Sequence, residues 1–257
     1  MKKNMEQKRP IGVFDSGLGG ISVLKTLREE LPEEDFIYYG DAANAPYGDR
    51  SETEICALTL AAAEHLAAQN IKALVIACNT ATSAAAEALR QKYDFPVIGM
   101  EPALKPAAQI PGSRVLVMAT CGTLRQRKFA ELLHIWGENV KVISLPCPGL
   151  VELIESGGPG NPDIYPYLQK LLAPYMGQVD AVVLGCTHYP FVQDQILKVL
   201  GNIPVHDGRN GTARQLVRRL KEQNLQRTNH RGTVSLQSSN PGSLALAERL
   251  MNGERKE

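Results

Sequence analysis

Short apolar runs alternate with longer amphipathic stretches along most of this chain, and that alternation limits most strongly what it can fold into. Most of the runs are nearly all apolar, as expected of parallel strands that helices cover on both faces. The predicted strands are 11–14, 36–39, 74–77, 97–100, 114–119, 141–145, 179–184 and 204–206. The pattern predicts an α/β fold with doubly wound, mainly parallel sheets.

The stretches between the strands predict helices. Ser51 is a good N-cap with Glu54 three residues later, Pro190 suits a first helical position and Gly201 suits a helix stop. The predicted helices are 21–31, 51–69, 81–93, 124–136, 164–176, 191–200, 211–223 and 242–251.

One local plan occurs twice: an apolar run, a small residue, a cysteine and a polar pair. It reads Ala77–Cys78–Asn79–Thr80 and again Gly185–Cys186–Thr187–His188, about one domain's length apart. We therefore predict two similar α/β lobes with the active site in the cleft between them. The predicted parts are a polar N-terminal tail at 1–10, a first lobe at 11–99 plus 207–257, and a second lobe at 100–206.

Charge and cysteine content exclude several classes of protein. With 28 basic and 27 acidic residues the net charge is +1, which gives no field to attract nucleic acid or an anionic membrane. The apolar run after the tail is too short for a signal-peptide core, and no segment reaches the roughly 18 apolar residues of a membrane helix. Five widely spaced cysteines without a CxxC pair indicate free thiols in the cytoplasm.

Polar clusters follow several predicted strands, where the functional crevice of an open α/β sheet lies. They begin at Asp15, Cys78 and Cys186, with a further cluster at 46–48. A single free cysteine is most often a small buried hydrophobe, but two in matching positions followed by hydrogen-bonding residues favour chemistry. Cys56, Cys121 and Cys147 lack that context and are predicted to be structural.

The same residues also fit chemistry of different kinds. The glycine-rich loop 15–20 could bind an anion or merely cap a helix, and it lacks the spacing of a nucleotide motif. Cys186 and His188 could form the nucleophile pair of a thiol hydrolase, which leaves Cys78 without a role. No zinc-type spacing occurs, so no metal is predicted. His65, His134 and His206 are predicted to be surface or core residues.

Five motifs in this order resemble the glutamate racemases of the aspartate/glutamate racemase superfamily. The resemblance runs from Ile11 to about Leu220. The motifs are Asp15–Ser16–Gly17–Leu18–Gly19–Gly20, Ala45–Pro46–Tyr47–Gly48, Ala77–Cys78–Asn79–Thr80, Glu101–Pro102–Ala103–Leu104–Lys105–Pro106 and Gly185–Cys186–Thr187–His188–Tyr189–Pro190.

The resemblance implies a two-lobed fold that encloses its substrate and needs no cofactor, neither pyridoxal phosphate nor metal. It implies that Cys78 and Cys186 are the two acid/base residues, acting on D- and L-glutamate respectively, and that Asp15 and His188 tune them. The positions matching the family's substrate-binding residues are Asp15, Ser16, Tyr47, Gly48, Asn79, Thr80, Thr187 and His188, with further carboxylate contacts near Thr120 and Thr123.

The implied function is the interconversion of L- and D-glutamate, which supplies D-glutamate for peptidoglycan synthesis, by an enzyme expected to be a homodimer. Aspartate racemase or a related cysteine-dependent isomerase is the nearest alternative, and a non-catalytic amino-acid-binding relative is a more distant one. The presence of both cysteines disfavours the latter, because binding alone does not require two thiols.

Several positions depart from the family pattern. Asn44 stands where arginine is common, Glu152 replaces a proline in the 147–152 segment, and 236–241 lacks the usual Thr/Ser-Gly-Asp. Glu155 still falls where the family has an acidic residue near the site. These departures leave the predicted catalytic residues intact and bear on oligomer contacts and regulation.

Overall fold

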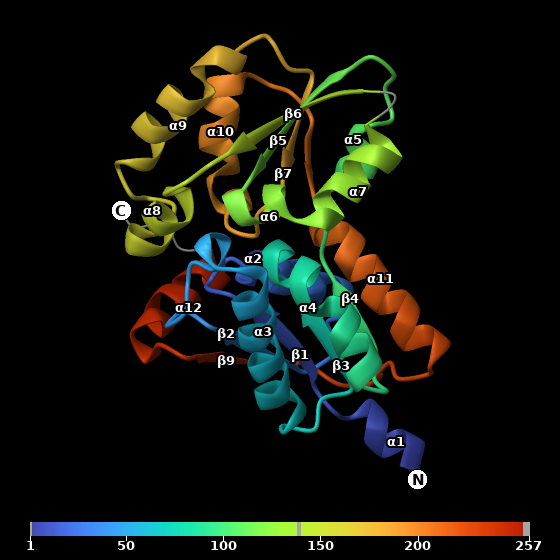
Figure 1. Ribbon diagram of the computed structural model, residues 1–257. Helices are drawn as coiled ribbons and strands as arrows, with labels where there is room; N and C mark the ends of the chain where they lie inside the picture. Colours follow the sequence, from blue (N-terminus) through green and yellow to red (C-terminus); the bar gives the residue numbers. More distant parts are fainter. Residues whose placement is uncertain (1, 138–139, 254–257) are drawn as a thin grey trace.

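The computed structural model describes residues 2–137 and 140–253, and within them the chain forms two separate parallel sheets (Figure 1). The first has the strand order β4-β3-β1-β2-β9 and the second β6-β5-β7-β8. The strands are β1 (Ile11–Asp15), β2 (Phe36–Gly40), β3 (Ala73–Ile76), β4 (Val97–Gly99), β5 (Arg114–Ala119), β6 (Lys141–Pro146), β7 (Ala181–Leu184), β8 (Val205–Asp207) and β9 (Val234–Ser238). The predicted fold class is confirmed.

Helices connect the strands. The α-helices are α1 (Lys2–Gln7), α2 (Ile21–Glu30), α3 (Glu52–Ala67), α4 (Asn79–Lys92), α5 (Leu104–Ala107), α6 (Cys121–Arg125), α7 (Arg127–Trp136), α8 (Leu150–Gly157), α9 (Ile164–Leu172), α10 (Gln193–Leu200), α11 (Arg209–Glu222) and α12 (Leu244–Asn252). Short 3₁₀ helices are η1 (Tyr47–Asp49), η2 (Ala173–Tyr175), η3 (Tyr189–Val192) and η4 (Pro241–Ser243). Ser51 forms the predicted capping box with Glu54 at the start of α3.

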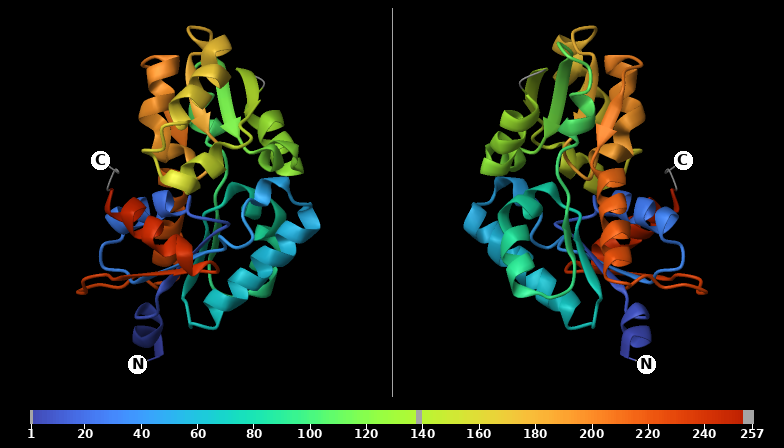
Figure 2. Two further views of the ribbon diagram at one scale, coloured as in Figure 1. Left: turned by 90° about the vertical axis from the view of Figure 1, so that its left-hand side faces the viewer. Right: turned by 90° about the vertical axis from the view of Figure 1, so that its right-hand side faces the viewer.

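Both sheets are buried on both faces, which explains their nearly apolar strands. In β3, Val75 packs in the core with α2, α11 and α12, whereas its neighbours Leu74 and Ile76 pack on the opposite face with α3 and α4. In β7, Val182 faces α8, α9 and α10, and Val183 faces the side of α5 and α7. Each sheet is therefore a three-layer sandwich, and Figure 2 shows the two sandwiches stacked end to end.

The chain passes between the sheets twice. Helix α11 directly follows β8 of the second sheet but packs against α2 of the first, and β9 then pairs with β2 at the edge of that sheet. The two segments that connect the sheets, one after β4 and one after β8, contact each other at Gly208, where an added Cβ would lie 2.8 Å from the carbonyl oxygen of Glu101. The predicted tail and lobes include residues 1, 138–139 and 254–257, which lie outside the described residues, and their limits remain a prediction.

The structure differs from the predicted elements in several places. Strand β9 was not predicted, because its short, half-polar sequence Val234–Ser238 belongs to an edge that is partly exposed. The predicted helix 124–136 is two helices, since Gln126 has extended backbone and its Nε2 donates to the carbonyl of Thr80 at 3.1 Å. Helices α1, α5 and α8 were also missed. The predicted tail is held to the body by Lys72, whose Nζ donates to the Gln7 carbonyl at 2.6 Å.

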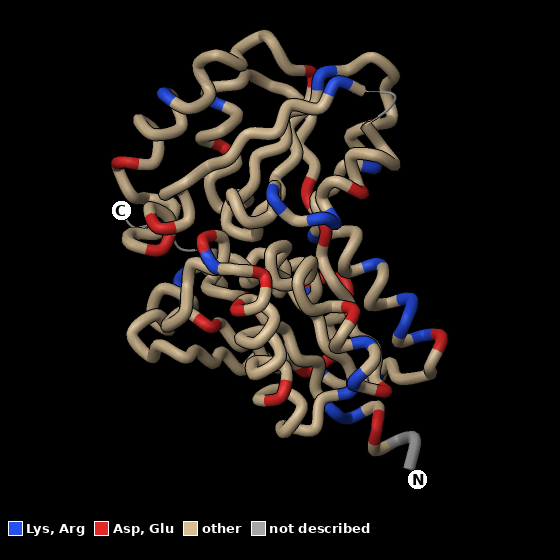
Figure 3. Tube along the Cα trace, viewed as in Figure 1, with Lys and Arg blue, Asp and Glu red and all other residues tan. Residues whose placement is uncertain are grey.

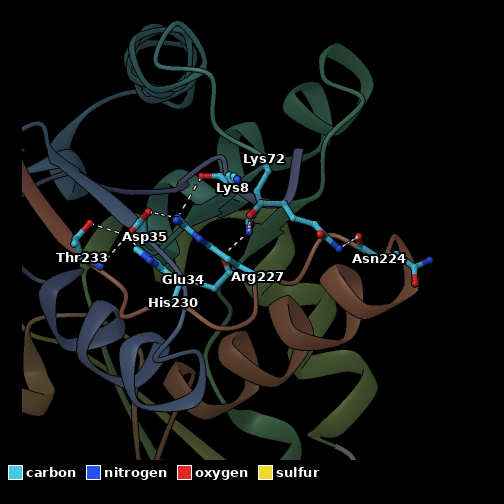
Figure 4. A network of polar contacts seen from close by, with 9 residues as sticks. Lys8, Glu34, Asp35, Lys72, Asn224, Arg227, His230 and Thr233 are labelled. Atoms are coloured by element: carbon cyan, nitrogen blue, oxygen red, sulfur yellow. Dashed lines mark hydrogen bonds and ion pairs between the residues drawn. The ribbon is translucent and has the colours of Figure 1, made fainter. Parts of the chain in front are cut away.

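A polar network fastens the segment before β9 to the start of β2 (Figure 4). Glu34 and Lys72 form a fully buried ion pair, and the backbone N–H of Arg227 donates to the other Glu34 carboxylate oxygen at 2.9 Å. Asp35 pairs with Arg227 and accepts from His230 at 2.9 Å. Burial raises the pKa of Glu34 and lowers that of Lys72, and the contacts between them oppose both shifts. The network lies at the amino ends of the strands, whereas the polar clusters that begin at Asp15 and Cys78 follow the carboxyl ends.

Charges of both signs are interspersed over the two lobes (Figure 3), as expected from the near-zero net charge. Within 2–137 and 140–253, none of the helices combines the length and the apolar character needed to cross a membrane.

Candidate active site

A small pocket lies between the two lobes, where the carboxyl ends of their strands meet. Every predicted site residue except Asp15 lines it, and so do Thr120, Thr123 and Glu155. The lining residues are Ser16, Gly17, Ala45, Pro46, Tyr47, Gly48, Cys78, Asn79, Thr80, Thr120, Thr123, Val151, Glu155, Gly185, Cys186, Thr187 and His188.

Cys78 is the N-cap residue of α4, because this helix begins at Asn79, earlier than the sequence predicted. Its Sγ accepts the N–H of Ala81 at 3.4 Å and lies 3.3 Å from the hydroxyl oxygen of Ser16. Burial, followed by the negative charge of Asp15, raises the pKa of Cys78 to about 12, although the two hydrogen bonds act in the opposite direction. Cys78 is therefore a neutral thiol in this pocket.

Cys186 follows β7 in the other lobe, and its surroundings differ from those of Cys78. Its Sγ lies 3.7 Å from Nδ1 of His188, within hydrogen-bonding reach of sulfur. The helix after it is the short η3, and its N-cap position is taken by His188. The sequence plan that the two cysteines share thus gives one thiol a helix terminus and the other an imidazole.

His188 links Cys186 to Glu155 on α8. Its Nε2 lies 2.7 Å from Oε1 of Glu155, and that oxygen also accepts the N–H of Leu18 at 2.9 Å. Burial alone would lower the pKa of His188, but hydrogen bonds with Cys186 and Glu155 outweigh it and raise this pKa well above its usual value. Burial likewise opposes ionisation of Glu155, but His188 lowers its pKa overall. The pair is therefore an imidazolium with a carboxylate.

Asp15 lies behind the pocket wall and does not reach the pocket surface. One carboxylate oxygen accepts the N–H of Gly17 at 2.9 Å, and the other accepts the hydroxyl of Thr187 at 3.0 Å. Complete burial raises its pKa, against the opposing positive charge of His188. The hydroxyl of Ser22 also donates to the Thr187 carbonyl at 2.8 Å. Asp15 and Ser22 thus position the Thr187 segment of the opposite lobe.

The start of α2 approaches that segment so closely that a side chain is excluded at Gly19. An added Cβ would lie 2.3 Å from Oγ1 of Thr187 and 2.4 Å from Nδ1 of His188, well inside contact distance. Glycine at this position therefore lets His188 keep its place beside Cys186.

Hydroxyl groups gather on another wall of the pocket. Oγ1 of Thr80 lies 3.2 Å from that of Thr120 and 3.0 Å from that of Thr123, and Thr120 caps α6. Beside them, the side-chain nitrogen and oxygen of Asn79 are buried and have no hydrogen-bond partner among the described residues. Because buried polar atoms are nearly always paired, this amide indicates that a polar ligand completes the site.

Tyr47 is held by a residue that the sequence did not mark as a site residue. Its hydroxyl donates to Oδ2 of Asp41 at 2.7 Å, and Asn44 donates to both oxygens of the same carboxylate. Asp41 directly follows β2, so its place at a carboxyl strand end was the available signal. Val151 was also missed as a lining residue, because no helix was predicted around it.

The remaining cysteines lie outside the pocket lining, and their structural role stays a prediction. Cys147 is buried, and its thiol donates to the carbonyl of Leu145 at 3.5 Å, whereas Cys56 and Cys121 are partly exposed. Among residues 2–137 and 140–253, no three His, Cys, Asp or Glu side chains are grouped so as to hold a metal ion.

The fold and the pocket define an α/β protein of two parallel sheets, with two buried thiols from different lobes lining one pocket. Residues 11–216 match the model of the Asp/Glu/Hydantoin racemase family, and the chain belongs to that family of isomerases.

Relatives of known name support this membership. A glutamate racemase of Clostridium perfringens is 53% identical over 222 residues, covering 84% of this chain and 85% of the relative. The crystal structure of a glutamate racemase isoform of Bacillus anthracis matches with a TM-score of 0.86 at 30% identity, covering 97% of this chain and 96% of that one. A Francisella tularensis glutamate racemase solved with D-glutamate matches with a TM-score of 0.83 at 30% identity, covering 97% and 96%.

Proposed function

We propose that this protein is a glutamate racemase that interconverts L- and D-glutamate by proton transfer between two cysteines, without a cofactor. The observation that carries the proposal is the shared pocket of Cys78 and Cys186, which approach it from different lobes with different polar partners. The high identity to a relative named glutamate racemase and the D-glutamate held by a structural neighbour support the choice of substrate.

Racemisation requires a proton to leave the α-carbon from one face and another to arrive on the opposite face. One base cannot readily serve both faces, so two opposed groups are needed. From L-glutamate, the thiolate of Cys186 takes the α-proton and becomes a thiol, while the thiol of Cys78 gives its proton to the other face and becomes a thiolate. From D-glutamate the two cysteines exchange roles. Positioned acid–base groups of this kind contribute roughly 10²–10⁴-fold each.

The contacts within the pocket favour Cys186 as the first base. Because Glu155 engages Nε2 of His188, Nδ1 faces Cys186, and its N–H in the imidazolium donates to the Cys186 thiolate and stabilises it. Cys78, whose pKa is raised to about 12, starts as the proton donor. This arrangement fits the assignment of Cys186 to L-glutamate and of Cys78 to D-glutamate.

The substrate's charged groups need partners on the pocket wall. We assign the unpaired amide of Asn79 and the hydroxyls of Thr80, Thr120 and Thr123 to the carboxylates, where fixed donors also stabilise charge that develops in the transition state. The other contacts are assigned to Ser16, Tyr47, Gly48, Thr187 and His188. Asp15 acts through Thr187 and is a positioning residue.

The product places the enzyme in the supply of D-glutamate for peptidoglycan, in the cytoplasm, and we expect a homodimer. The activity is tested by incubating the pure protein with L-glutamate in deuterated water, without added cofactor. We expect loss of optical rotation together with deuterium at the α-carbon. L-Aspartate in a parallel reaction separates glutamate racemase from its nearest alternative. If neither D-glutamate nor α-deuterium forms, the proposal is wrong.

A further inference from the structure

The pocket is closed to a substrate in this conformation. Cys78 is 6% exposed and Cys186 is 7% exposed, and Tyr47 is 1% exposed. An amino acid therefore reaches the thiols only after part of the wall has moved. The lobes meet along two edges of the pocket, and the contacts at these edges differ in kind.

Along one edge the contacts are buried and tightly fitted. Thr187 is bonded to Asp15 and to Ser22 of the opposite lobe, and both of these partners are buried. Gly19 lies so close to Thr187 and His188 that no Cβ fits between them. Separating the lobes here would leave buried polar groups unpaired, which is costly.

At the other edge, the loop that carries Tyr47 and Gly48 lies against α6. Figures 1 and 2 both show this light-blue segment directly below the upper lobe. Two glycines make the close approach, because a Cβ on Gly122 would lie 2.7 Å from the carbonyl oxygen of Gly48. Across this contact, Nη2 of the exposed Arg125 donates to the same carbonyl oxygen at 3.0 Å.

The loop is braced internally, so it can move as a unit. Asp41 holds both Tyr47 and Asn44, and Nε of Arg50 donates to the Asn44 carbonyl at 2.9 Å. Beneath the loop, the bonds that join Thr80 to Thr120 and Thr123 are between hydroxyls, which can exchange one another for water or a ligand carboxylate. Opening at this edge also separates Nε2 of Gln126 from the Thr80 carbonyl, which it donates to at 3.1 Å, whereas Arg125 supplies the one charged donor that crosses to Gly48 at the rim.

We propose that the hydrogen bond from Arg125 to the carbonyl of Gly48 is the clasp of the pocket, and that its release opens this edge to admit substrate and release product. The clasp governs access to both thiols, and Arg125 itself takes no part in the proton transfers. The inference rests on the proposed racemase reaction for the identity of the substrate, but the clasp can be tested without any turnover.

The test is the rate at which iodoacetamide alkylates Cys78 and Cys186, followed by peptide mass spectrometry on the folded protein at pH 8.5. In Arg125→Ala we expect both rates to rise about five-fold, the factor that corresponds to ~1 kcal/mol for one part-buried hydrogen bond. Arg125→Lys keeps a donor and should give a smaller rise. Cys56, on α3 outside the pocket, serves as the internal reference.

Arg127→Ala is the matched control, since Arg127 is 90% exposed and pairs with Glu131 of its own helix at 2.9 Å. Its alkylation rates should equal those of the parent protein. Gly122→Ala pushes the same two segments apart without altering the guanidinium, and it should also raise the rates. Unchanged rates for Cys78 in both Arg125→Ala and Gly122→Ala would overturn the clasp, whether or not the protein racemises glutamate.

Discussion

Oε1 of Glu155 lies 2.7 Å from Nε2 of His188, and the same oxygen accepts the backbone N–H of Leu18 from the opposite lobe. Glu155 thus holds the imidazole against Cys186 and joins α8 to the loop after β1. Two sequence features meet in this contact: Glu155, an acidic residue shortly after the atypical 147–152 segment, and the histidine two residues after the second cysteine.

Glu155→Gln should keep the shape of this contact and remove its charge. The pKa of His188 should then fall, so the imidazolium is lost at a lower pH and the alkaline limb of the kcat/KM profile should move to lower pH. We expect kcat/KM to fall about 10–100-fold, the effect of ~1–3 kcal/mol. The fall in kcat/KM must be equal for L- and D-glutamate. The enantiomers have equal free energy, so the equilibrium constant is one and the two directions keep equal values of kcat/KM.

Glu152→Gln is the control for that measurement, because Glu152 lies on the exposed side of the same helix. Its pH–rate profile should match that of the parent enzyme. An unmoved alkaline limb in Glu155→Gln would show that Glu155 does not act through His188.

Gly19→Ala should disable the site while leaving most of the fold intact. Its Cβ would require a place 2.4 Å from Nδ1 of His188, so the imidazole must shift away from Cys186. Misplacement of a catalytic group by about 1 Å can cost ~10²-fold, and we expect at least that loss in kcat/KM. Near-normal activity in Gly19→Ala would contradict the assigned position of His188.

Gly211→Ala is the matched control for this glycine. Gly211 lies in α11, and a Cβ there would meet nothing within 4 Å. The substitution should leave activity unchanged and raise stability by up to ~1 kcal/mol, because alanine is the better helix former. Thermal melts of the two variants measure both effects.

Asp35→Asn should make stability less dependent on pH. Burial opposes ionisation of Asp35, but hydrogen bonds from His230 and Thr233 and the charge of Arg227 outweigh it and lower its pKa to about 2. A depressed carboxyl pKa contributes stability that is present above the unfolded value of 3.8 and is lost as pH falls toward 2. At pH 7 the variant should melt roughly 2–6 °C lower.

The difference between Asp35→Asn and the parent protein should shrink as the pH of the melts is lowered from 5 to 2.5. Asp94→Asn, at an exposed position, should track the parent protein throughout. A melting difference that stays constant with pH would mean that the charge of Asp35 does not stabilise the fold.

Part of this structure was predictable because local sequence determines it. The strands from β1 to β8 were found from short runs that are mostly apolar, and Cys78 and Cys186 were found as candidates from their matching surroundings. Strand β9 was missed because Val234–Ser238 alternates polar and apolar residues at a partly exposed edge. The break at Gln126 depends on its bond to Thr80, a contact between lobes that no local pattern encodes.

The sequence predicted which residues lie at the pocket, but it did not predict where their side chains point. Asp15 was expected at the substrate, but its carboxylate turns toward Thr187, because the start of α2 packs against the opposite lobe. The contact of Arg125 with Gly48 likewise exists only once the lobes are packed together. Such contacts join residues far apart in the sequence, and one sequence alone does not specify them.

The central claim is that two thiols from different lobes share one proton-transfer reaction, and single substitutions test it most directly. Cys78→Ala and Cys186→Ala are each incubated with L-glutamate and, separately, with D-glutamate, and the opposite enantiomer is quantified by chiral chromatography. Each variant should lose racemisation by roughly 10²–10⁴-fold or more in both directions, while Cys56→Ala keeps the parent rate. A near-parental rate in either Cys78→Ala or Cys186→Ala would contradict the two-cysteine account.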